Sequence, residues 1–128
     1  MLNLPTTTRI FVYTQPTDMR KSFEGLSGII EQVFDAQLLS GDVFVFVNRR
    51  RDRLKAMAWD GDGFWIWYKR LEAGTFQLPS ASSVAVELDA AELSMILGGI
   101  DLSSVRRRKR YRIAEPRLPR KTEKSSRV

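Results

Sequence analysis

The spacing of apolar side chains divides the chain into segments typical of strands and helices. Residues 9–14 form a run rich in β-branched and aromatic side chains that ends at Gln15-Pro16, which predicts a first strand. From Phe23 to Phe34 the apolar positions recur at steps of three and four residues, which predicts an amphipathic helix of about three turns. A side-chain oxygen of Asp18 or Ser22 would accept hydrogen bonds from the first amides of this helix.

Two glycines fall inside the predicted helix. Gly25 and Gly28 each weaken a helix by about 1 kcal/mol relative to alanine, and both lie near the apolar stripe. We therefore interpret them as positions at which the helix packs closely against a sheet.

The middle of the chain has the pattern of a strand followed by a hairpin. Residues 43–47 are apolar at every position, which predicts a central strand covered on both faces. Residues 53–59 and 64–70 flank the sequence Asp60-Gly61-Asp62-Gly63, and Asp-Gly supplies the positive φ that tight hairpin turns need. In the second of these strands, Phe64, Ile66 and Tyr68 point to one face and Trp65, Trp67 and Lys69 to the other.

The remaining patterns complete a small domain. Residues 74–79 predict a short extended return, and residues 84–88 predict an edge strand. A second helix is expected from about Ala90 to Leu97, because Asp89 and Glu92 have capping-box spacing and Gly98-Gly99 would end it. We predict an α+β domain over residues 1–102, with a small antiparallel meander sheet of about 4–5 strands packed with two short helices.

Composition restricts the chemistry that this domain can carry. The 128 residues suit a single core, and the chain contains neither Cys nor His, which excludes disulfides, thiolate zinc sites and the commonest general base. The N-terminus lacks a signal pattern, and no apolar run approaches the ~18 residues that span a bilayer. We therefore expect a cytoplasmic protein.

Charge is distributed unevenly along the chain. Residues 1–102 carry 10 Lys/Arg and 13 Asp/Glu, a net charge of −3, whereas residues 103–128 carry 11 and 2, a net charge of +9. The second segment cannot bury enough apolar surface to fold alone. We predict a basic, disordered arm over residues 103–128 that a polyanion would order.

A second concentration of positive charge lies at the tip of the first hairpin, where the sequence Asn48-Arg49-Arg50-Arg51-Asp52-Arg53 packs four arginines into six residues. Guanidinium groups bind phosphate oxygens in a fork geometry, so we predict DNA contacts at the tip and along the arm. The candidate DNA-binding residues are Arg49, Arg50, Arg51, Arg53, Lys55, Arg106, Arg107, Arg108, Lys109, Arg110 and Arg112. The alternative is that both segments are merely solvated.

Aromatic and acidic residues offer two further kinds of site. Trp65 and Trp67 could stack unpaired bases, but tryptophans at this spacing on a central hairpin more often pack in a core, and the same holds for Trp59. A metal-dependent nuclease or recombinase would need clustered carboxylates, yet Asp60 and Asp62 lie in a tight turn and the other acids are scattered. We expect no enzymatic activity, no metal and no cofactor.

Several short motifs, in this order along the chain, resemble one known family. They are Asp18-Met19-Arg20-Lys21-Ser22, Gly41, Phe44-Val45-Phe46, Asn48-Arg49-Arg50, Asp52-Arg53-Leu54-Lys55, Trp59-Asp60-Gly61, Gly63-Phe64, Tyr68-Lys69-Arg70-Leu71-Glu72, Gly74, Phe76 and residues 97–102. Together they resemble the accessory protein encoded by the second open reading frame of insertion sequence sixty-six elements. That protein is often called TnpB and is distinct from the RNA-guided nuclease of the same label.

The resemblance covers about Thr8 to Leu102 and implies a bacterial mobile-element protein that assists transposition beside a separate transposase. It implies no known biochemical activity. Combined with the basic segments, it predicts a non-enzymatic accessory factor that binds DNA at transposon ends. The alternative is a protein–protein adaptor for the element's transposase that makes no direct DNA contact.

Overall fold

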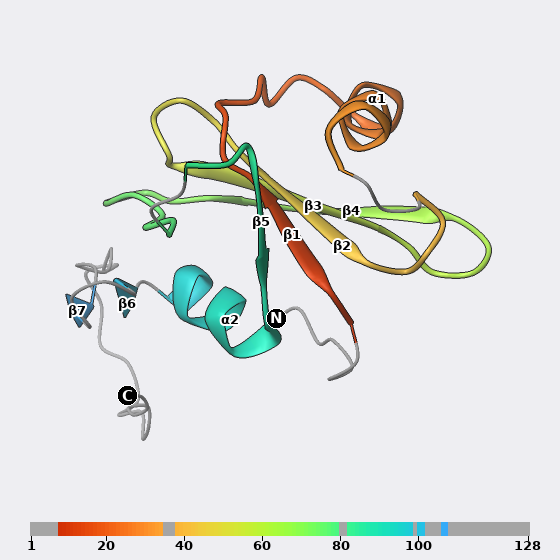
Figure 1. Ribbon diagram of the computed structural model, residues 1–128. Helices are drawn as coiled ribbons and strands as arrows, with labels where there is room; N and C mark the ends of the chain where they lie inside the picture. The colour runs from red at the N-terminus through yellow and green to blue at the C-terminus, as the bar shows by residue number, and fades with distance from the viewer. Residues whose placement is uncertain (1–7, 35–37, 80–81, 99, 102–105, 108–128) are drawn as a thin grey trace, which may run out of the picture.

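The protein folds around one five-stranded sheet. The computed structural model describes residues 8–34, 38–79, 82–98, 100–101 and 106–107. The strands of the sheet lie in the order β4-β3-β2-β1-β5 (Figure 1). Their bounds are β1 Ile10–Tyr13, β2 Val43–Val47, β3 Arg53–Trp59, β4 Phe64–Arg70 and β5 Ala85–Leu88.

Most neighbouring strands run antiparallel, as the sequence predicts for an α+β fold with two helices. The pairs β2–β3, β3–β4 and β1–β5 are antiparallel. The pair β1–β2 is parallel, with Val12 opposite Val45, so the sheet departs here from a continuous meander. Helix α1, Phe23–Val33, lies in the connection between these two strands, since a parallel pair needs a crossover.

The β3–β4 hairpin has the register expected from its turn. Trp59 lies opposite Phe64, and Arg53 lies opposite Arg70 at the other end of the ladder. The amide of Asp60 donates to the carbonyl oxygen of Gly63 at 2.9 Å, and Gly61 has a φ of 107°. Glycine therefore supplies the positive φ that this turn requires.

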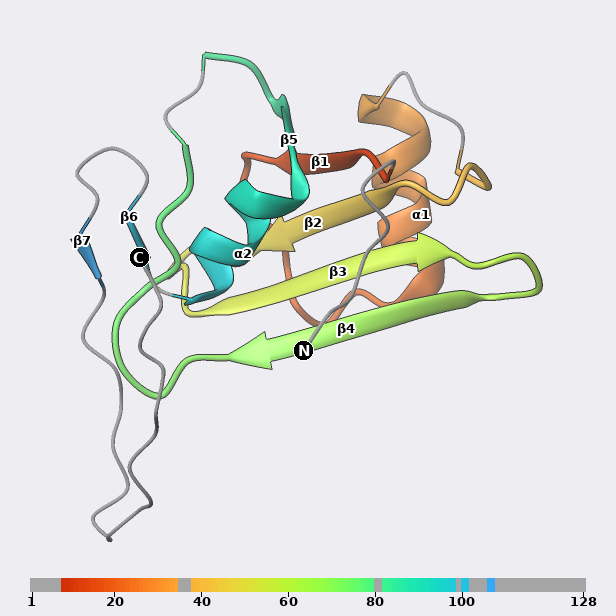
Figure 2. The same ribbon diagram turned by 90° about the horizontal axis from the view of Figure 1, so that it is seen from below.

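The two helices cover opposite faces of the sheet. Helix α1 lies on one side and α2, Ala90–Gly98, on the other, as Figure 2 shows from the α2 side. On the α1 face, Leu26 and Ile30 pack with Phe44, Phe46 and Met57. On the α2 face the buried residues are Ile10, Val12, Val43, Val45, Val47, Leu54, Ala56, Ala58, Phe76, Leu88, Leu93, Ile96 and Leu97. The continuous apolar run of β2 is thus buried on both faces, as predicted.

The aromatic side chains of β4 divide between these two faces. Phe64 and Ile66 pack against the α1 cluster, while Trp65 and Trp67 pack against the α2 cluster. All four are partly buried. The packing interpretation of the tryptophans therefore fits their positions, because their rings cover the edge of the core.

The beginning of α1 differs from the prediction. Ser22 is the N-cap residue, but its side chain makes no capping hydrogen bond. The carboxylate of Asp18 accepts instead from the amide of Arg20, in the turn before the helix. An added Cβ at Gly25 would lie 3.1 Å from the side chain of Lys21, and at Gly28 it would meet nothing within 4 Å. Close packing on the sheet is therefore not the reason for either glycine.

Helix α2 begins with the predicted capping box. The amide of Glu92 donates to the Asp89 carboxylate at 2.8 Å, and the amide of Asp89 donates to the Glu92 carboxylate at 3.0 Å. One amide of the first turn and the amide of the residue before the helix are thereby satisfied. Residues 74–79, predicted as an extended return, form no strand but place Phe76 in the core.

Two short strands follow α2. β6, Ile100–Asp101, pairs antiparallel with β7, Arg106–Arg107. The rest of the predicted disordered arm, residues 108–128, and residues 102–105 lie outside the described residues. Within the described part of the chain, neither helix has the length and apolarity that a membrane crossing requires.

Candidate nucleic-acid interface

The arginine-rich turn between β2 and β3 is held by the side chain of Asn48. Its Oδ1 accepts from the amides of Asp52 and Arg53, both at 3.0 Å, and its Nδ2 donates to the Asp52 carboxylate at 2.7 Å. The backbone adds a bond from the Arg51 amide to the Asn48 carbonyl at 3.0 Å. Arg51 has a φ of 60°, in the left-handed region. The turn therefore has a defined shape from which the arginine side chains project.

Neighbouring segments fix this turn to the body. The amide of Phe76 donates to the carbonyl of Arg51 at 2.7 Å, and the amide of Leu71 donates to the carbonyl of Asp52 at 2.8 Å. On the other side, the amide of Thr17 donates to the carbonyl of Val47 at 2.9 Å. The β2–β3 turn is thus supported by three separate parts of the chain.

The parallel pairing of β1 and β2 explains why the loop containing Thr17 reaches this turn. Parallel strands end at the same edge of a sheet, so the chain leaving Tyr13 and the chain leaving Val47 meet there. Strand β4 also ends at this edge, because it is antiparallel to β3. Three strands therefore end at this one edge of the sheet, which brings the segments that follow β1, β2 and β4 to the same side of the molecule.

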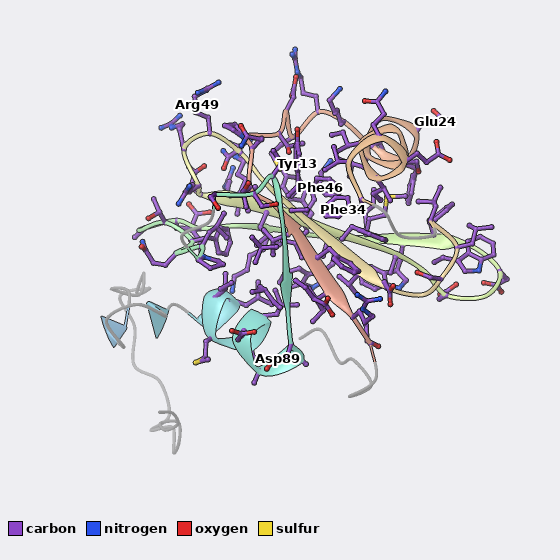
Figure 3. All side chains as sticks on the ribbon, in the orientation of Figure 1. Tyr13, Glu24, Phe34, Phe46, Arg49 and Asp89 are labelled. Carbon is purple, nitrogen blue, oxygen red and sulfur yellow. The ribbon has the colours of Figure 1, made fainter. Side chains whose placement is uncertain are left out.

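The arginines at the tip are unpaired, and three of the four are exposed. Arg49, Arg50 and Arg51 are exposed, and Arg53 is half-buried. None of the four forms an ion pair within 4 Å with another residue that the structure describes. Figure 3 shows Arg49 pointing outward on the side of the sheet that carries α1. The hydrogen bond from Asn48 lowers the pKa of Asp52, and the charges of Arg50 and Arg53 lower it further.

A further arginine, Arg20, contributes to the same surface from the loop before α1. Arg20 has a side chain 91% exposed, and its Nη2 lies 2.8 Å from the carboxylate of Asp18. The hydrogen bonds from Arg20 lower the pKa of Asp18 from 3.8 to about 2. The two side chains form a charge pair at the rim of the surface, in contrast to the unpaired arginines of the turn.

Lys55, also predicted as a DNA contact, has a different position. It is only 8% exposed, and its ammonium group donates to the carbonyl of Lys21 at 2.7 Å. The same Nζ lies 4.9 Å from the ring centroid of Tyr68. Because this cation is buried and bound within the protein, Lys55 supports the surface from below and is not among its exposed contacts.

A hollow of about 440 Å³ lies at the centre of this surface. Its lining comes from three places: the loop after β1, the β2–β3 turn and the end of β4. The lining residues are Thr17, Asp18, Met19, Arg20, Asn48, Arg49, Arg50, Arg53 and Tyr68. We call this hollow and its lining the basic hollow.

The basic hollow contains only part of the predicted set. Arg49, Arg50 and Arg53 are brought together there, whereas Arg51 is exposed beside it. Sequence reasoning did not identify Arg20 or Tyr68 as site residues, although both belong to motifs that carry the family resemblance. Their contribution depends on tertiary contacts, because Arg20 lies 29 residues before Arg49 in the chain and Tyr68 lies 15 residues after Arg53.

The arm residues cannot be placed on this surface. Arg106 and Arg107 form strand β7, with Arg107 opposite Ile100 and Arg106 opposite Asp101. Arg108, Lys109, Arg110 and Arg112 lie outside the described residues, so their role stays a prediction.

Carboxylates are dispersed over the described part of the chain. Asp60 and Asp62 lie at the far end of β3 from the basic hollow, a seven-residue strand or about 20 Å away. Among the described residues, no three or more His, Cys, Asp or Glu residues come together in a group that could hold a metal ion.

Comparisons with known proteins place these features in a family. The profile described as IS66 Orf2 like protein matches residues 8–107, so it reaches past Leu102 and includes β7. The uncharacterized protein y4jC of Sinorhizobium fredii is 37% identical over 100 residues, covering 78% of this chain and 86% of the relative. The uncharacterized protein y4hO of the same organism is 39% identical over 93 residues, covering 73% and 81%. No solved structure matches the chain.

Proposed function

Because the chain belongs to the IS66 Orf2-like family, a family of accessory proteins associated with transposition, we propose that it assists its insertion sequence by binding DNA. The contacts come from the basic hollow and from the basic arm. The protein acts without catalysing a reaction itself, and the chemistry of strand transfer belongs to the element's separate transposase.

Three unpaired guanidinium groups on one fixed turn support DNA binding most directly. Arg49, Arg50 and Arg53 have no ion-pair partner among the described residues, while the turn beneath them is held by Asn48. Like charges on one fixed turn repel one another, and the carboxylate of Asp52 offsets only part of this repulsion, so a further anion is attracted there. Phosphate oxygens suit the guanidinium fork, and a preformed turn loses little entropy on binding.

The arm contributes to DNA affinity through its charge, and it does not define how the protein is oriented on DNA. Residues 108–128 carry 9 Lys/Arg and 2 Asp/Glu, a net charge of +7. Each phosphate that such a segment neutralises releases counterions, which strengthens binding at low salt. The arm therefore supplies a sequence-independent attraction, while the basic hollow sets the orientation on DNA.

A salt titration tests the contribution of the hollow. We expect the triple variant Arg49→Gln, Arg50→Gln, Arg53→Gln to bind duplex DNA more weakly and to lower the slope of log K against log salt by about 2 to 3, since each phosphate contact contributes roughly 0.9. The matched control is Arg9→Gln. Arg9 is exposed but paired with Glu87, and it precedes β1 at the opposite end of the sheet.

An unchanged slope in the triple variant would mean that the basic hollow does not contact DNA phosphates. The arm is tested in the same titration with Arg108, Lys109, Arg110 and Arg112 changed to Gln in the full chain. Relative to the native protein, we expect this arm variant to lower the slope of log K against log salt by up to about 4. If only the arm variant changes the slope, then the folded body does not bind DNA.

The competing hypothesis is an adaptor that binds the element's transposase. Co-purification with the transposase, with and without nuclease treatment, separates the two roles. A complex lost on nuclease treatment would mean that DNA bridges the two proteins, which would support DNA binding by this chain. A complex that survives, combined with no measurable DNA affinity of the free protein, would favour the adaptor.

A further inference from the structure

Tyr68 differs from the other aromatic residues of the sheet. The rings of Phe44 and Phe46 are fully buried, and those of Trp65 and Trp67 pack against the α2 face. Tyr68 is 49% exposed and lines the basic hollow. A large ring is therefore partly exposed to solvent in a hollow that is also lined by arginines.

The ring of Tyr68 is held in place from within the protein. Tyr68 lies opposite Lys55 in the β3–β4 ladder, and the Lys55 ammonium lies 4.9 Å from its ring centroid. That ammonium is itself fixed by the carbonyl of Lys21 at 2.7 Å. A cation near the face of a ring is attracted to its π system, so this contact helps to hold the Tyr68 ring in one orientation.

The surroundings of the ring match the parts of a nucleotide. Arg49, Arg50 and Arg53 line the same hollow and offer guanidinium groups to phosphates. The one carboxylate in the lining, Asp18, is already bound by Arg20 at 2.8 Å, which reduces its repulsion of an anion. The volume of about 440 Å³ is in the range of small-ligand sites.

We propose that the basic hollow binds a nucleotide of unpaired DNA, with its base stacked on Tyr68 and its flanking phosphates bound by Arg49, Arg50 and Arg53. A base inside a duplex is stacked on both faces by its neighbours, so only an unpaired or extruded base can stack on the tyrosine. Stacking is available to every base, so this contact distinguishes strand state and not sequence. This inference rests on the proposed function, because it specifies the form of DNA that the same surface binds.

The test compares three probes of about 12 nucleotides, a length that spans one single-strand site. They are labelled oligo-dT, a duplex of the same length, and an oligonucleotide of abasic sites that keeps the phosphates but lacks the bases. Binding of each probe by the full chain is followed by fluorescence anisotropy. We expect Tyr68→Ala to weaken binding of oligo-dT about 5- to 100-fold, as measured for the loss of one base–aromatic stack.

The other probes and variants isolate the stacking contact. Tyr68→Ala should change the affinity for the duplex and for the abasic strand by less than about twofold, because both are bound through phosphates alone. Tyr68→Phe should keep the affinity for oligo-dT, since the stacking ring remains. This variant also shows that the hydroxyl group is not the source of the effect, and thermal unfolding of both variants checks that they fold.

Two results would overturn the inference. Equal losses on all three probes would mean that Tyr68 acts through folding or general electrostatics, and no loss on any probe would mean that no base stacks there. In either case, duplex binding that still depends on Arg49, Arg50 and Arg53 would leave the proposed function intact. If the triple arginine variant binds the duplex as tightly as the native protein does, then the proposed function of the hollow is itself wrong, whatever the result for Tyr68.

Discussion

At the scale of single residues, a side chain without charge organises the most charged part of the body. Asn48 satisfies two amides and one carboxylate of the turn that carries the arginines. Its amide can do so because it is both donor and acceptor, whereas the arginines are only donors. The arginines are therefore free to bind a ligand, while the asparagine fixes where they are.

Asn48→Ala should destabilise the protein by about 1–3 kcal/mol, because the amides of Asp52 and Arg53 lose their acceptor in a partly buried turn. Unfolding in urea, followed by tryptophan fluorescence, measures the change. Arg49→Ala is the neighbouring control, and since its side chain is exposed it should alter stability by less than about 0.5 kcal/mol. Equal stability of the two variants would contradict the role given to Asn48.

The Asp18–Arg20 pair predicts a pH dependence. The pKa of Asp18 is lowered from 3.8 to about 2 by the hydrogen bonds from Arg20. A lowered pKa means that the pair stabilises the folded state above about pH 4 and that this contribution is lost as the pH falls through about 2.

In an NMR titration of the folded protein, we expect the Asp18 carboxyl resonance to have its midpoint near 2. Arg20→Ala should raise this midpoint toward 3.8, although the backbone amide of residue 20 still donates to the carboxylate. A midpoint that does not move in Arg20→Ala would show that the side-chain hydrogen bond is not the cause.

At the scale of elements, local sequence and tertiary packing favour the same register in the β3–β4 hairpin. The turn Asp60-Gly61-Asp62-Gly63 fixes the register, and the two-residue alternation along β4 then sends Trp65 and Trp67 to the α2 face. The loop leading into α1 shows the opposite case. Asp18 has the chemistry of an N-cap, but its carboxylate binds the amide and guanidinium of Arg20.

Gly61→Ala should cost about 1–3 kcal/mol, because a φ of 107° is strained for any residue with a Cβ. Gly63→Ala is the matched control in the same turn. Gly63 has no positive φ, and an added Cβ there would meet nothing within 4 Å, so a change below about 0.5 kcal/mol is expected. Thermal or urea unfolding of both variants provides the comparison. Similar losses in the two would mean that backbone strain at Gly61 does not limit the hairpin.

At the scale of the whole molecule, the parallel pair β1–β2 determines where the candidate site forms. It directs the loop after β1 to the same edge of the sheet as the β2–β3 turn, and the bond from Thr17 to Val47 joins them. In a purely antiparallel meander, successive strands end at opposite edges, so Arg20 and Arg49 would lie far apart. The basic hollow is therefore a consequence of topology.

Local features of this protein could be predicted from its sequence. Periodicity located both helices and the main strands, Asp-Gly fixed the β3–β4 register, and the capping box at Asp89 and Glu92 marked the start of α2. The clustered arginines marked the turn in which Arg49, Arg50 and Arg53 come to line one hollow. Each of these features depends on residues close together in the chain, where side-chain spacing and backbone preference have direct structural effects.

The residues that share a surface could be identified from the three-dimensional fold alone. It placed Lys55 inside the protein and exposed Tyr68 beside Arg49 and Arg53. It also showed that an added Cβ at Gly28 would meet nothing within 4 Å and that the Asp18 carboxylate accepts from the amide of Arg20. These outcomes depend on the direction in which strands pair and on contacts between distant segments. Both follow from how the whole core packs, which no local pattern specifies.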